Sequence, residues 1–333
     1  MNLMPQRIFV TGAAGFIGFH LADRLLTLGY EVFGIDNFNG YYSAQLKYDR
    51  HVQLEQYKNY QWEKCDICDV ELLQALMVDF QPDCVVNLAA QVGVRHSVDN
   101  PSIYQKSNLE GFLNILECCR NLMPKPRLIY ASSSSVYGGN KELPFTENQS
   151  VDTPINLYAA TKKANELMAY SYSHLFGLQT IGLRIFTSYG PWGRPDMAYW
   201  LFTEQLLKGK SITVFNHGEM YRDFTYIDDI VTSVVGCIAA QSLPLYDIFN
   251  VGSNRAEKLM DLIRLIAREI NISHPSMTFL PMQNGDMPRT FASVEKLHSA
   301  IGYQFTTPIS VGIPKFIEWF KAYQKKHEDI KFF

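Results

Sequence analysis

Short apolar runs alternate with helix-like segments along the first half of the chain. Continuous apolar runs of this kind are typical of buried strands, and the segments between them have apolar residues at helical spacing. The runs expected to be strands are RIFVTG (7–12), EVFGID (31–36), QWEKCDI (61–67), DCVVNLAA (83–90), RLIYASS (127–133) and TIGLRIF (180–186). Helices are expected within 19–29 and near 70–79, 101–121 and 155–175. Strands that are apolar on both faces and separated by helices predict an α/β fold, a doubly wound parallel sheet covered on both sides.

The pattern loosens in the second half of the chain, where shorter elements alternate with loops rich in aromatic residues, glycine and proline. One later run, YDIFNVG (246–252), has the composition of a core strand and is expected to return to the sheet. We therefore predict a dinucleotide-binding domain and a smaller C-terminal α/β substrate lobe. The domain takes in 1–186 with a returning segment near 228–252, and the lobe takes in 187–227 and 253–333.

Three glycines follow the first expected strand directly. Gly12, Gly15 and Gly18 stand at the start of the next helix with the spacing G-x-x-G-x-x-G. Glycines there allow a tight turn, a close approach of the backbone to a pyrophosphate and close helix–strand packing, and the free amides of the helix start attract phosphate. The second strand ends in Asp36, whose carboxylate would accept hydrogen bonds from the adenosine ribose and repel a 2′-phosphate. The segment therefore predicts a site for NAD rather than NADP.

Composition narrows the choice of partners. The chain has 333 residues, 47% of them apolar, with a formal net charge of −3 and a pI of about 6.2. Such a chain has no basic field to attract nucleic acid or an anionic membrane. No apolar run approaches the roughly 20 residues of a membrane span and the first residues lack signal-peptide character, so a cytoplasmic location is expected. Cys65 and Cys68 form a C-x-x-C pair without further ligands, so no metal is expected.

A tyrosine and a lysine stand four residues apart near the start of an expected helix. Tyr158 and Lys162 therefore share one helix face. A free tyrosine, with a pKa of about 10, is a poor base at neutral pH. A nearby ammonium and a positively charged nicotinamide ring would both lower that pKa and make the phenol a workable general base. Because such pairs also occur by chance in helices, the assignment depends on the glycine loop and on the serine run at 132–135.

The segments TGAAGFIG (11–18), SSSSVYG (132–138) and YAATK (158–162) together resemble the extended short-chain dehydrogenase/reductase family, in its branch of nucleotide-sugar epimerases and dehydratases. The resemblance implies a Rossmann-type domain, bound NAD and a homodimer joined through a four-helix contact that includes the Tyr-Lys helix. It assigns the contact with the sugar 4-hydroxyl to Ser133. The cofactor-binding residues that it implies are Gly12, Gly15, Phe16, Ile17, Gly18, Asp36, Asn37, Asp66, Ile67, Ala89, Ala90 and Lys162. Asn108 matches a helix-bending asparagine of the family, with a plain helix-surface residue as the alternative.

The serine run separates the expected reaction from related ones. Family dehydratases carry Asp-Glu directly after the catalytic hydroxyl, and the sugar-acid decarboxylases carry Glu just before the Val. This chain has Ser134 and Ser135 at those positions. Two ordinary hydroxyls cannot supply the acid and the base that elimination of water requires. The remaining groups, Ser133, Tyr158 and NAD, predict an isomerase that removes the hydride from C4 of a nucleotide sugar and returns it.

The sugar is predicted from the segments 183–198 and 214–230, which resemble those of the UDP-glucuronate 4-epimerases. Galactose-type epimerases have Asn where this chain has Thr187. The resemblance implies that Thr187 and Arg194 hold the sugar carboxylate, and a guanidinium suits a carboxylate because paired hydrogen bonds join them. The 4-keto form of a uronic acid is a β-keto acid that tends to lose carbon dioxide. We expect the two residues to hold the acid group away from the angle at which it leaves.

Two further arginines are expected near the UDP phosphates. Arg222 matches the family's phosphate-binding arginine, and Arg289 is a second candidate because Gln283 stands where the galactose branch has arginine. Ser134 and Ser135 complete the expected substrate contacts.

Three alternatives stay open: an epimerase for UDP-glucose or UDP-N-acetylglucosamine, a dehydratase or decarboxylase, and a non-enzymatic NAD-binding scaffold. The first would not need Arg194, the second lacks its acid and base, and the third would not need the catalytic residues.

Overall fold

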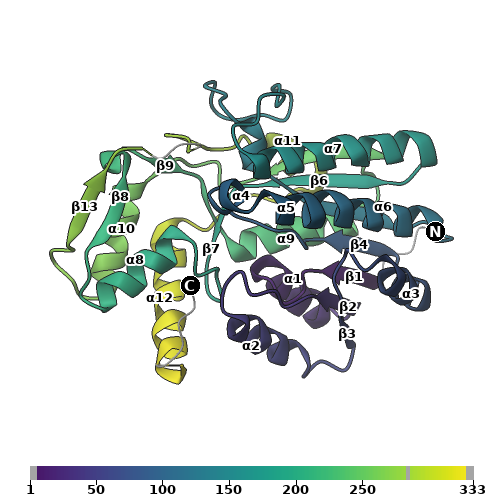
Figure 1. Ribbon diagram of the computed structural model, residues 1–333, viewed down its shortest axis with the longest axis horizontal. Helices are drawn as coiled ribbons and strands as arrows, with labels where there is room; N and C mark the ends of the chain where they lie inside the picture. Colours follow the sequence, from purple (N-terminus) through teal and green to yellow (C-terminus); the bar gives the residue numbers. More distant parts are fainter. Residues whose placement is uncertain (1–5, 283–285, 328–333) are drawn as a thin grey trace.

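The computed structural model describes residues 6–282 and 286–327 (Figure 1). Its centre is a seven-stranded parallel sheet in the order β11-β6-β5-β4-β1-β2-β3. The strands are β1 (Arg7–Thr11), β2 (Glu31–Asp36), β3 (Tyr60–Lys64), β4 (Cys84–Asn87), β5 (Arg127–Ser133), β6 (Thr180–Ile185) and β11 (Tyr246–Val251). Helices cover both faces, so the predicted doubly wound α/β fold is confirmed.

The alternation of side chains along β1 divides the core into two layers. Ile8 and Val10 point into one apolar cluster, together with residues of α1 (Phe16–Thr27) and α9 (Ile227–Ala239). Phe9 points into the other cluster, on the opposite side of the sheet. That side is covered by α3 (Val70–Phe80), α6 (Gly111–Asn121) and α7 (Leu157–Phe176). Residues fully buried on both faces explain why these strands read as continuous apolar runs.

A smaller lobe lies beside the sheet, at the left of Figure 1. Its helices α8 (Ala198–Leu207), α10 (Leu259–Glu269) and α12 (Ile309–Lys326) pack together, and β8 (Ile212–Phe215) pairs with β13 (Met277–Leu280). Short strand pairs join it to the sheet domain. They are β7 (Thr187–Tyr189) with β10 (Phe224–Tyr226), and β9 (Tyr221–Arg222) with β12 (Glu257–Lys258). The division of the chain into domain and lobe stays a prediction.

The remaining elements are short, apart from α2 (Ala44–Leu54). The segment expected as one helix near 101–121 is α5 (Pro101–Tyr104), a π-helical turn η1 (Gln105–Glu110) and then α6. The others are α4 (His96–Asp99), η2 (Ser134–Tyr137), η3 (Asn216–Gly218) and α11 (Glu295–Ile301).

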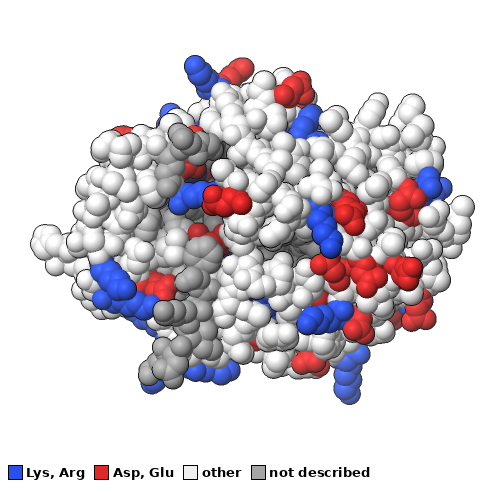
Figure 2. Space-filling model, in the orientation of Figure 1, with Lys and Arg blue, Asp and Glu red and all other residues white. Residues whose placement is uncertain are grey.

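Among the residues described, none of the helices has the length and apolar character that a membrane span requires. On the face shown in Figure 2, basic side chains lie among acidic ones, a mixture that does not attract a polyanion.

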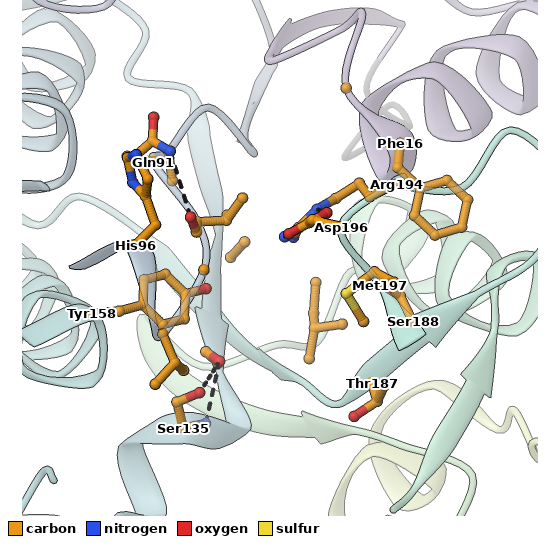
Figure 3. A pocket seen from close by; sticks show the side chains of 18 of the residues that line it. Phe16, Gln91, His96, Ser135, Tyr158, Thr187, Ser188, Arg194, Asp196 and Met197 are labelled. Carbon is orange, nitrogen blue, oxygen red and sulfur yellow. Dashed lines mark hydrogen bonds and ion pairs between the residues drawn. The ribbon is translucent and has the colours of Figure 1, made fainter. Parts of the chain in front are cut away.

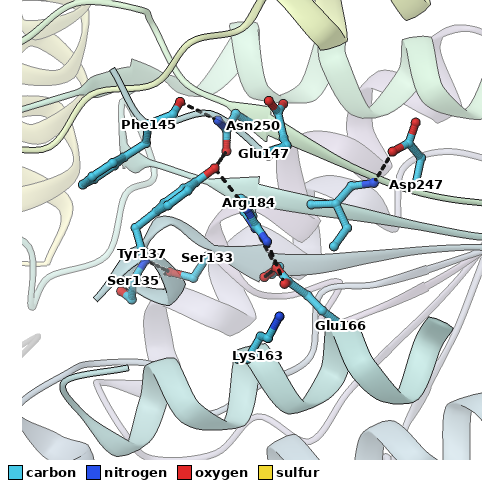
Figure 4. Close-up of polar contacts among 12 residues, drawn as sticks. Ser133, Ser135, Tyr137, Phe145, Glu147, Lys163, Glu166, Arg184, Asp247 and Asn250 are labelled. Carbon is cyan, nitrogen blue, oxygen red and sulfur yellow. Dashed lines mark hydrogen bonds and ion pairs between the residues drawn. The ribbon is translucent and has the colours of Figure 1, made fainter. Parts of the chain in front are cut away.

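A buried ion pair ties α7 to the sheet (Figure 4). Arg184 of β6 donates from Nε and Nη2 to the two carboxylate oxygens of Glu166 of α7, at 2.8 and 2.9 Å. The hydroxyl of Ser132, in β5, donates to the same carboxylate at 2.7 Å. Arg184 Nη1 reaches the hydroxyl of Tyr137 at 3.1 Å, and that hydroxyl donates to Asn250 of β11 at 2.7 Å. This network thereby holds together three neighbouring strands, helix α7 and the turn η2, which carries Tyr137.

Glu166→Gln should destabilise the protein strongly. The amide cannot neutralise Arg184, and a buried guanidinium without its counter-charge costs about 3–5 kcal/mol. The free energy of unfolding, measured with urea, should fall by that amount. The double variant Glu166→Gln/Arg184→Met is the control, because it removes the stranded charge and should recover part of the loss. Equal stability of wild type and Glu166→Gln would contradict the importance of the pair.

Candidate active site

One cavity of about 990 Å³ opens between the carboxyl edge of the sheet and the lobe (Figure 3). The carboxyl ends of β1, β2, β4 and β5 all reach it, because parallel strands end at the same edge. Its lining includes every residue that the sequence assigned to cofactor, catalysis or substrate, with the exception of Arg289. The predicted residues are therefore brought to one place, although they come from segments up to about 200 positions apart along the chain.

Two positions of the glycine loop, Gly12 and Gly18, leave no room for a side chain. Gly12 has a φ of +69°, and a β-carbon there would lie 2.9 Å from the amide nitrogen of Ala89. A β-carbon on Gly18 would lie 2.0 Å from the carbonyl oxygen of Gly12. The first bond into helix α1 runs from the Phe19 amide to the Gly15 carbonyl at 3.0 Å, so the three amides before Phe19 have no acceptor inside the helix. A backbone cradle with free amides fits a pyrophosphate.

Two carboxylates lie beyond this loop, at the ends of β2 and β3. Asp36 accepts hydrogen bonds from the amides of Ala14, at 3.2 Å, and Phe38, at 2.8 Å, which fix its orientation. Asp66 accepts from the side chain of Asn37 at 2.8 Å and from the amide of Cys68 at 2.9 Å. Burial acts to raise the pKa of Asp66, but these hydrogen bonds outweigh it and lower the pKa. Fixed acceptors at this position fit the hydroxyls and the base of an adenosine.

The candidate catalytic groups come from the end of β5 and the start of α7. Asn156 caps the helix by accepting a hydrogen bond from the Ala159 amide at 2.8 Å. The hydroxyl of Ser133 donates to that of Ser135 at 3.2 Å. Lys162 is almost fully buried, and its ammonium donates to the carbonyl of Ala131 at 2.8 Å. In Figure 3, Tyr158 points into the cavity on the same side as Ser135.

The protein's own groups together raise the pKa of Tyr158. Burial is the largest influence and raises the pKa, while the neighbouring Ser133 hydroxyl and the charge of Arg194 lower it in part. The ammonium of Lys162 is directed at the Ala131 carbonyl, and burial lowers its own pKa to about 8. The expected lowering of the pKa of Tyr158 by Lys162 together with a bound nicotinamide ring stays a prediction.

Asn108 lies in the π-helical turn and is buried, so the surface alternative is wrong. Its side chain accepts from the Gln91 amide at 2.8 Å and donates to the Gln91 carbonyl at 3.0 Å. It also donates to the hydroxyl of Thr161 at 3.0 Å, and its own carbonyl accepts from Asn165 at 2.7 Å. The wider π-helical turn thereby joins the loop after β4 to the helix that carries Tyr158 and Lys162.

Arg194 lies across the cavity from Tyr158, on the same side as Thr187 (Figure 3). Its guanidinium donates from Nε to Oδ1 of Asp196 at 3.0 Å and from Nη2 to Oδ2 at 2.5 Å. The side chain of Arg194 is 20% exposed and lines the cavity. Asp196 is not among the residues predicted from the sequence, although an acid two residues after the candidate arginine is a visible signal.

The loop before Arg194 is held by the sheet domain. Arg50 of α2 donates to the carbonyls of Trp192, at 2.7 and 3.1 Å, and Gly193, at 2.9 Å. Its Nη1 donates to the carbonyl of Ala14 in the glycine loop at 3.0 Å. A ring nitrogen of His20 in α1 lies 2.9 Å from the carbonyl of Pro191. No sequence signal identifies Arg50, because its acceptors are backbone carbonyls far away in the chain.

The predicted phosphate-binding arginines differ in their surroundings. Arg222 lines the cavity, where burial lowers its pKa and Asp286, 3.8 Å away, partly offsets the effect. Arg289 is exposed and stacks on the ring of Tyr221 at 4.7 Å, outside the cavity lining. Gln283 lies outside the described residues. A further cation, Arg95, lines the cavity, with its guanidinium carbon 4.9 Å from the centre of the Phe215 ring. It was not among the residues predicted from the sequence.

Comparison with known proteins agrees with this geometry. Residues 8–252 match the model of the NAD dependent epimerase/dehydratase family, and the chain belongs to that family. It is 44% identical to UDP-glucuronate 4-epimerase 4 of Arabidopsis thaliana, over 95% of this chain and 75% of the relative. It is also 44% identical to Protein CapI of Staphylococcus aureus, over 96% and 100%. A crystal structure of UDP-glucuronic acid 4-epimerase from Bacillus cereus, in complex with UDP-glucuronic acid and NAD, superposes with a TM-score of 0.90 at 33% identity, covering 95% of this chain and 99% of that one.

Replacing Lys162 should stabilise the protein without nucleotide while lowering its turnover. Burial lowers the pKa of Lys162 from 10.5 to about 8, so the folded protein holds the proton less tightly than the unfolded chain. The lysine therefore destabilises the fold fully below about pH 8, and this effect fades as the pH rises toward 10.5. The pKa shift corresponds to about 3 kcal/mol, and loss of the hydrogen bond to Ala131 offsets about 1 kcal/mol of it. Lys162→Met should therefore raise the free energy of unfolding at pH 7 by about 2 kcal/mol, with a smaller gain at pH 10.

Urea unfolding of nucleotide-free protein at several pH values measures this effect. Lys163→Met, at the half-buried neighbouring position, is the matched control and should change the stability little. A Lys162→Met variant that is less stable than wild type at pH 7 would contradict the expectation.

Proposed function

We propose that the chain is an NAD-dependent isomerase that interconverts UDP-glucuronate and UDP-galacturonate by inverting C4. The observation that carries the proposal is the arrangement of one cavity, in which Tyr158 and Ser135, the hydrogen-bond partner of Ser133, lie on one wall and Thr187 and Arg194 lie across from them. The wall with Tyr158 can exchange a proton with a sugar hydroxyl, and the wall with Arg194 can bind a carboxylate. The names of the relatives in Arabidopsis thaliana and Bacillus cereus support the same activity.

The proton of the sugar 4-hydroxyl is handled by Tyr158 and Ser133. The phenolate of Tyr158 accepts the proton when C4 is oxidised and returns it when C4 is reduced, and the Ser133 hydroxyl orients the sugar oxygen. NAD, held by the glycine loop, Asp36 and Asp66, supplies the acceptor for the C4 hydride and gives the hydride back. Inversion requires that the 4-keto sugar turn over in the cavity, so that its other face meets the cofactor.

The second wall protects the acid group of the sugar. The 4-keto uronic acid is a β-keto acid, and it loses carbon dioxide when the bond from C5 to the carboxyl stands perpendicular to the ketone plane. Arg194 binds the carboxylate through paired charge-assisted hydrogen bonds, together with the hydroxyl of Thr187. The serines at 134 and 135 offer no acid or base for elimination. These residues favour epimerisation over decarboxylation and dehydration.

Parallel incubations with UDP-glucuronate and UDP-glucose test the proposal, with separation of the sugar nucleotides formed. UDP-galacturonate should form from the first substrate, and UDP-galactose should form much more slowly or not at all from the second. Faster turnover of UDP-glucose would favour the neutral-sugar alternative. A mainly decarboxylated or dehydrated product would favour the second alternative, and absence of any product with either sugar would favour the binding scaffold.

Tyr158→Phe should lower kcat at least about 100-fold, because a correctly placed acid–base group contributes 10²–10⁴ in rate. Binding of NAD should persist, since the glycine loop and the two carboxylates are unchanged. The matched control is Tyr48→Phe, an exposed tyrosine of α2 outside the cavity lining. Near-normal turnover of Tyr158→Phe in the assay with UDP-glucuronate would refute the role of the phenol.

We also propose that two copies pair through α6 and α7, in the cytoplasm. Helices α6 and α7 pack against each other and carry exposed apolar side chains, with Leu113 41%, Leu167 59% and Tyr170 55% accessible. Apolar side chains gathered on adjacent helices are typical of an interface. Leu167→Glu should therefore convert a dimer into a monomer in sedimentation experiments, whereas Val78→Glu on α3, also about half exposed, should not. A monomeric wild type would refute the pairing.

A further inference from the structure

Arg194 is held by a carboxylate of its own loop, and the contact uses only part of its guanidinium. Asp196 takes up Nε and one hydrogen of Nη2 in a side-on pair. A guanidinium has five N–H donors in a rigid plane. Within residues 6–282 and 286–327, Nη1 donates to no other residue, so its two hydrogens and the second hydrogen of Nη2 form a free end. That end of the fork is the one that can take up the carboxylate of a ligand in the cavity.

Asp196 is itself held from the other part of the molecule. Its side chain is 9% exposed, and Oδ2 accepts a hydrogen bond from the hydroxyl of Tyr41 at 3.1 Å. Tyr41 follows β2, and its ring lies edge-on to that of His96 at 4.8 Å. Burial and the charge of Asp196 raise the pKa of Tyr41, which keeps the phenol protonated and able to donate. The carboxylate is therefore oriented by two segments that are far apart in the sequence.

The main chain around the pair is fixed as well. Arg50 and His20 contact the carbonyls of three consecutive residues, 191–193, immediately before Arg194. With the backbone held in this way, the direction of the guanidinium depends on the torsions of its long side chain. An arginine side chain has considerable rotamer entropy, and a paired carboxylate removes most of that freedom. Asp196 is thus the contact that decides where the free end of the fork points.

We propose that Asp196 is a positioning residue that aims Arg194 at the acid group of the sugar and thereby determines whether the oxidised sugar keeps its carboxylate. The inference rests on the proposed function. If the guanidinium of Arg194 turns away from the sugar, the bond from C5 to the carboxyl group can become perpendicular to the plane of the 4-ketone. The bond from C5 to the carboxyl carbon then breaks, carbon dioxide leaves, and the bonding pair passes to the ketone as an enolate. A proton added at C5 completes a 4-keto pentose, which the returning hydride reduces to a UDP-pentose, with NAD restored.

The test compares Asp196→Asn with wild type in an assay with UDP-glucuronate. The amide oxygen of Asn can still accept one hydrogen bond, but the charged pair is lost. The UDP-pentose fraction of the product should rise at least about tenfold, since hydrogen bonds between charged groups are worth that factor or more. Asp99→Asn, an acid that lines the same cavity and is exposed, is the matched control and should leave the fraction unchanged.

Tyr41→Phe is the second variant, and it decides the question if Asp196→Asn does not fold. It removes only the hydroxyl that orients Asp196, so the pentose fraction should rise in the same direction by a smaller factor. If Asp196→Asn folds, a UDP-pentose fraction equal to that of wild type would overturn the inference, whatever happens to KM. If it does not fold, the same result with Tyr41→Phe would overturn it. Absence of UDP-galacturonate from the wild-type reaction would instead overturn the proposed function, so the two failures are distinguishable.

Discussion

The ion pair between Arg184 and Glu166 holds the rest of the site in place. Glu166 stands one helical turn after Lys162 and two turns after Tyr158, while its other partner, Ser132, precedes Ser133 in β5. The pair therefore fixes the strand that carries the candidate catalytic serine against the helix that carries the tyrosine and the lysine. Because both charges are buried, the pair tolerates little displacement, and rigid placement of this kind is what a proton transfer over hydrogen-bond distance requires.

Three arginines organise the cavity, and each uses its planar fork differently. Arg184 pairs with the buried Glu166, Arg50 joins the glycine loop to the loop before Arg194 through backbone carbonyls, and Arg194 donates to Asp196 with only part of its guanidinium. The fork of Arg50 links the loop that fits the cofactor phosphates to the loop that carries the carboxylate contact. One side chain therefore connects the cofactor side of the cavity to the loop that carries Arg194.

The sequence predicted the parts of the site whose chemistry depends on local spacing. The glycines, Asp36, the Tyr-Lys pair and the serine run all stand in short segments, and the alternation of strands and helices brings such segments to one sheet edge. It did not predict Asp196 or Arg50, and it left the place of Asn108 open, because the partners of these residues lie in other segments or in the backbone. It also did not show that burial raises the pKa of Tyr158 or that the Lys162 ammonium is directed at the Ala131 carbonyl, since both are properties of the folded chain.

We propose that one hydride leaves C4 of a uronic acid and returns to the same carbon while the acid group stays attached. The most direct measurement uses UDP-glucuronate labelled with deuterium at C4 and follows the label in the product by mass spectrometry and NMR. UDP-galacturonate should form with the deuterium fully retained at C4, in ordinary water and without added reductant. Loss of the label to the solvent would contradict it, because the label would then have left as a proton.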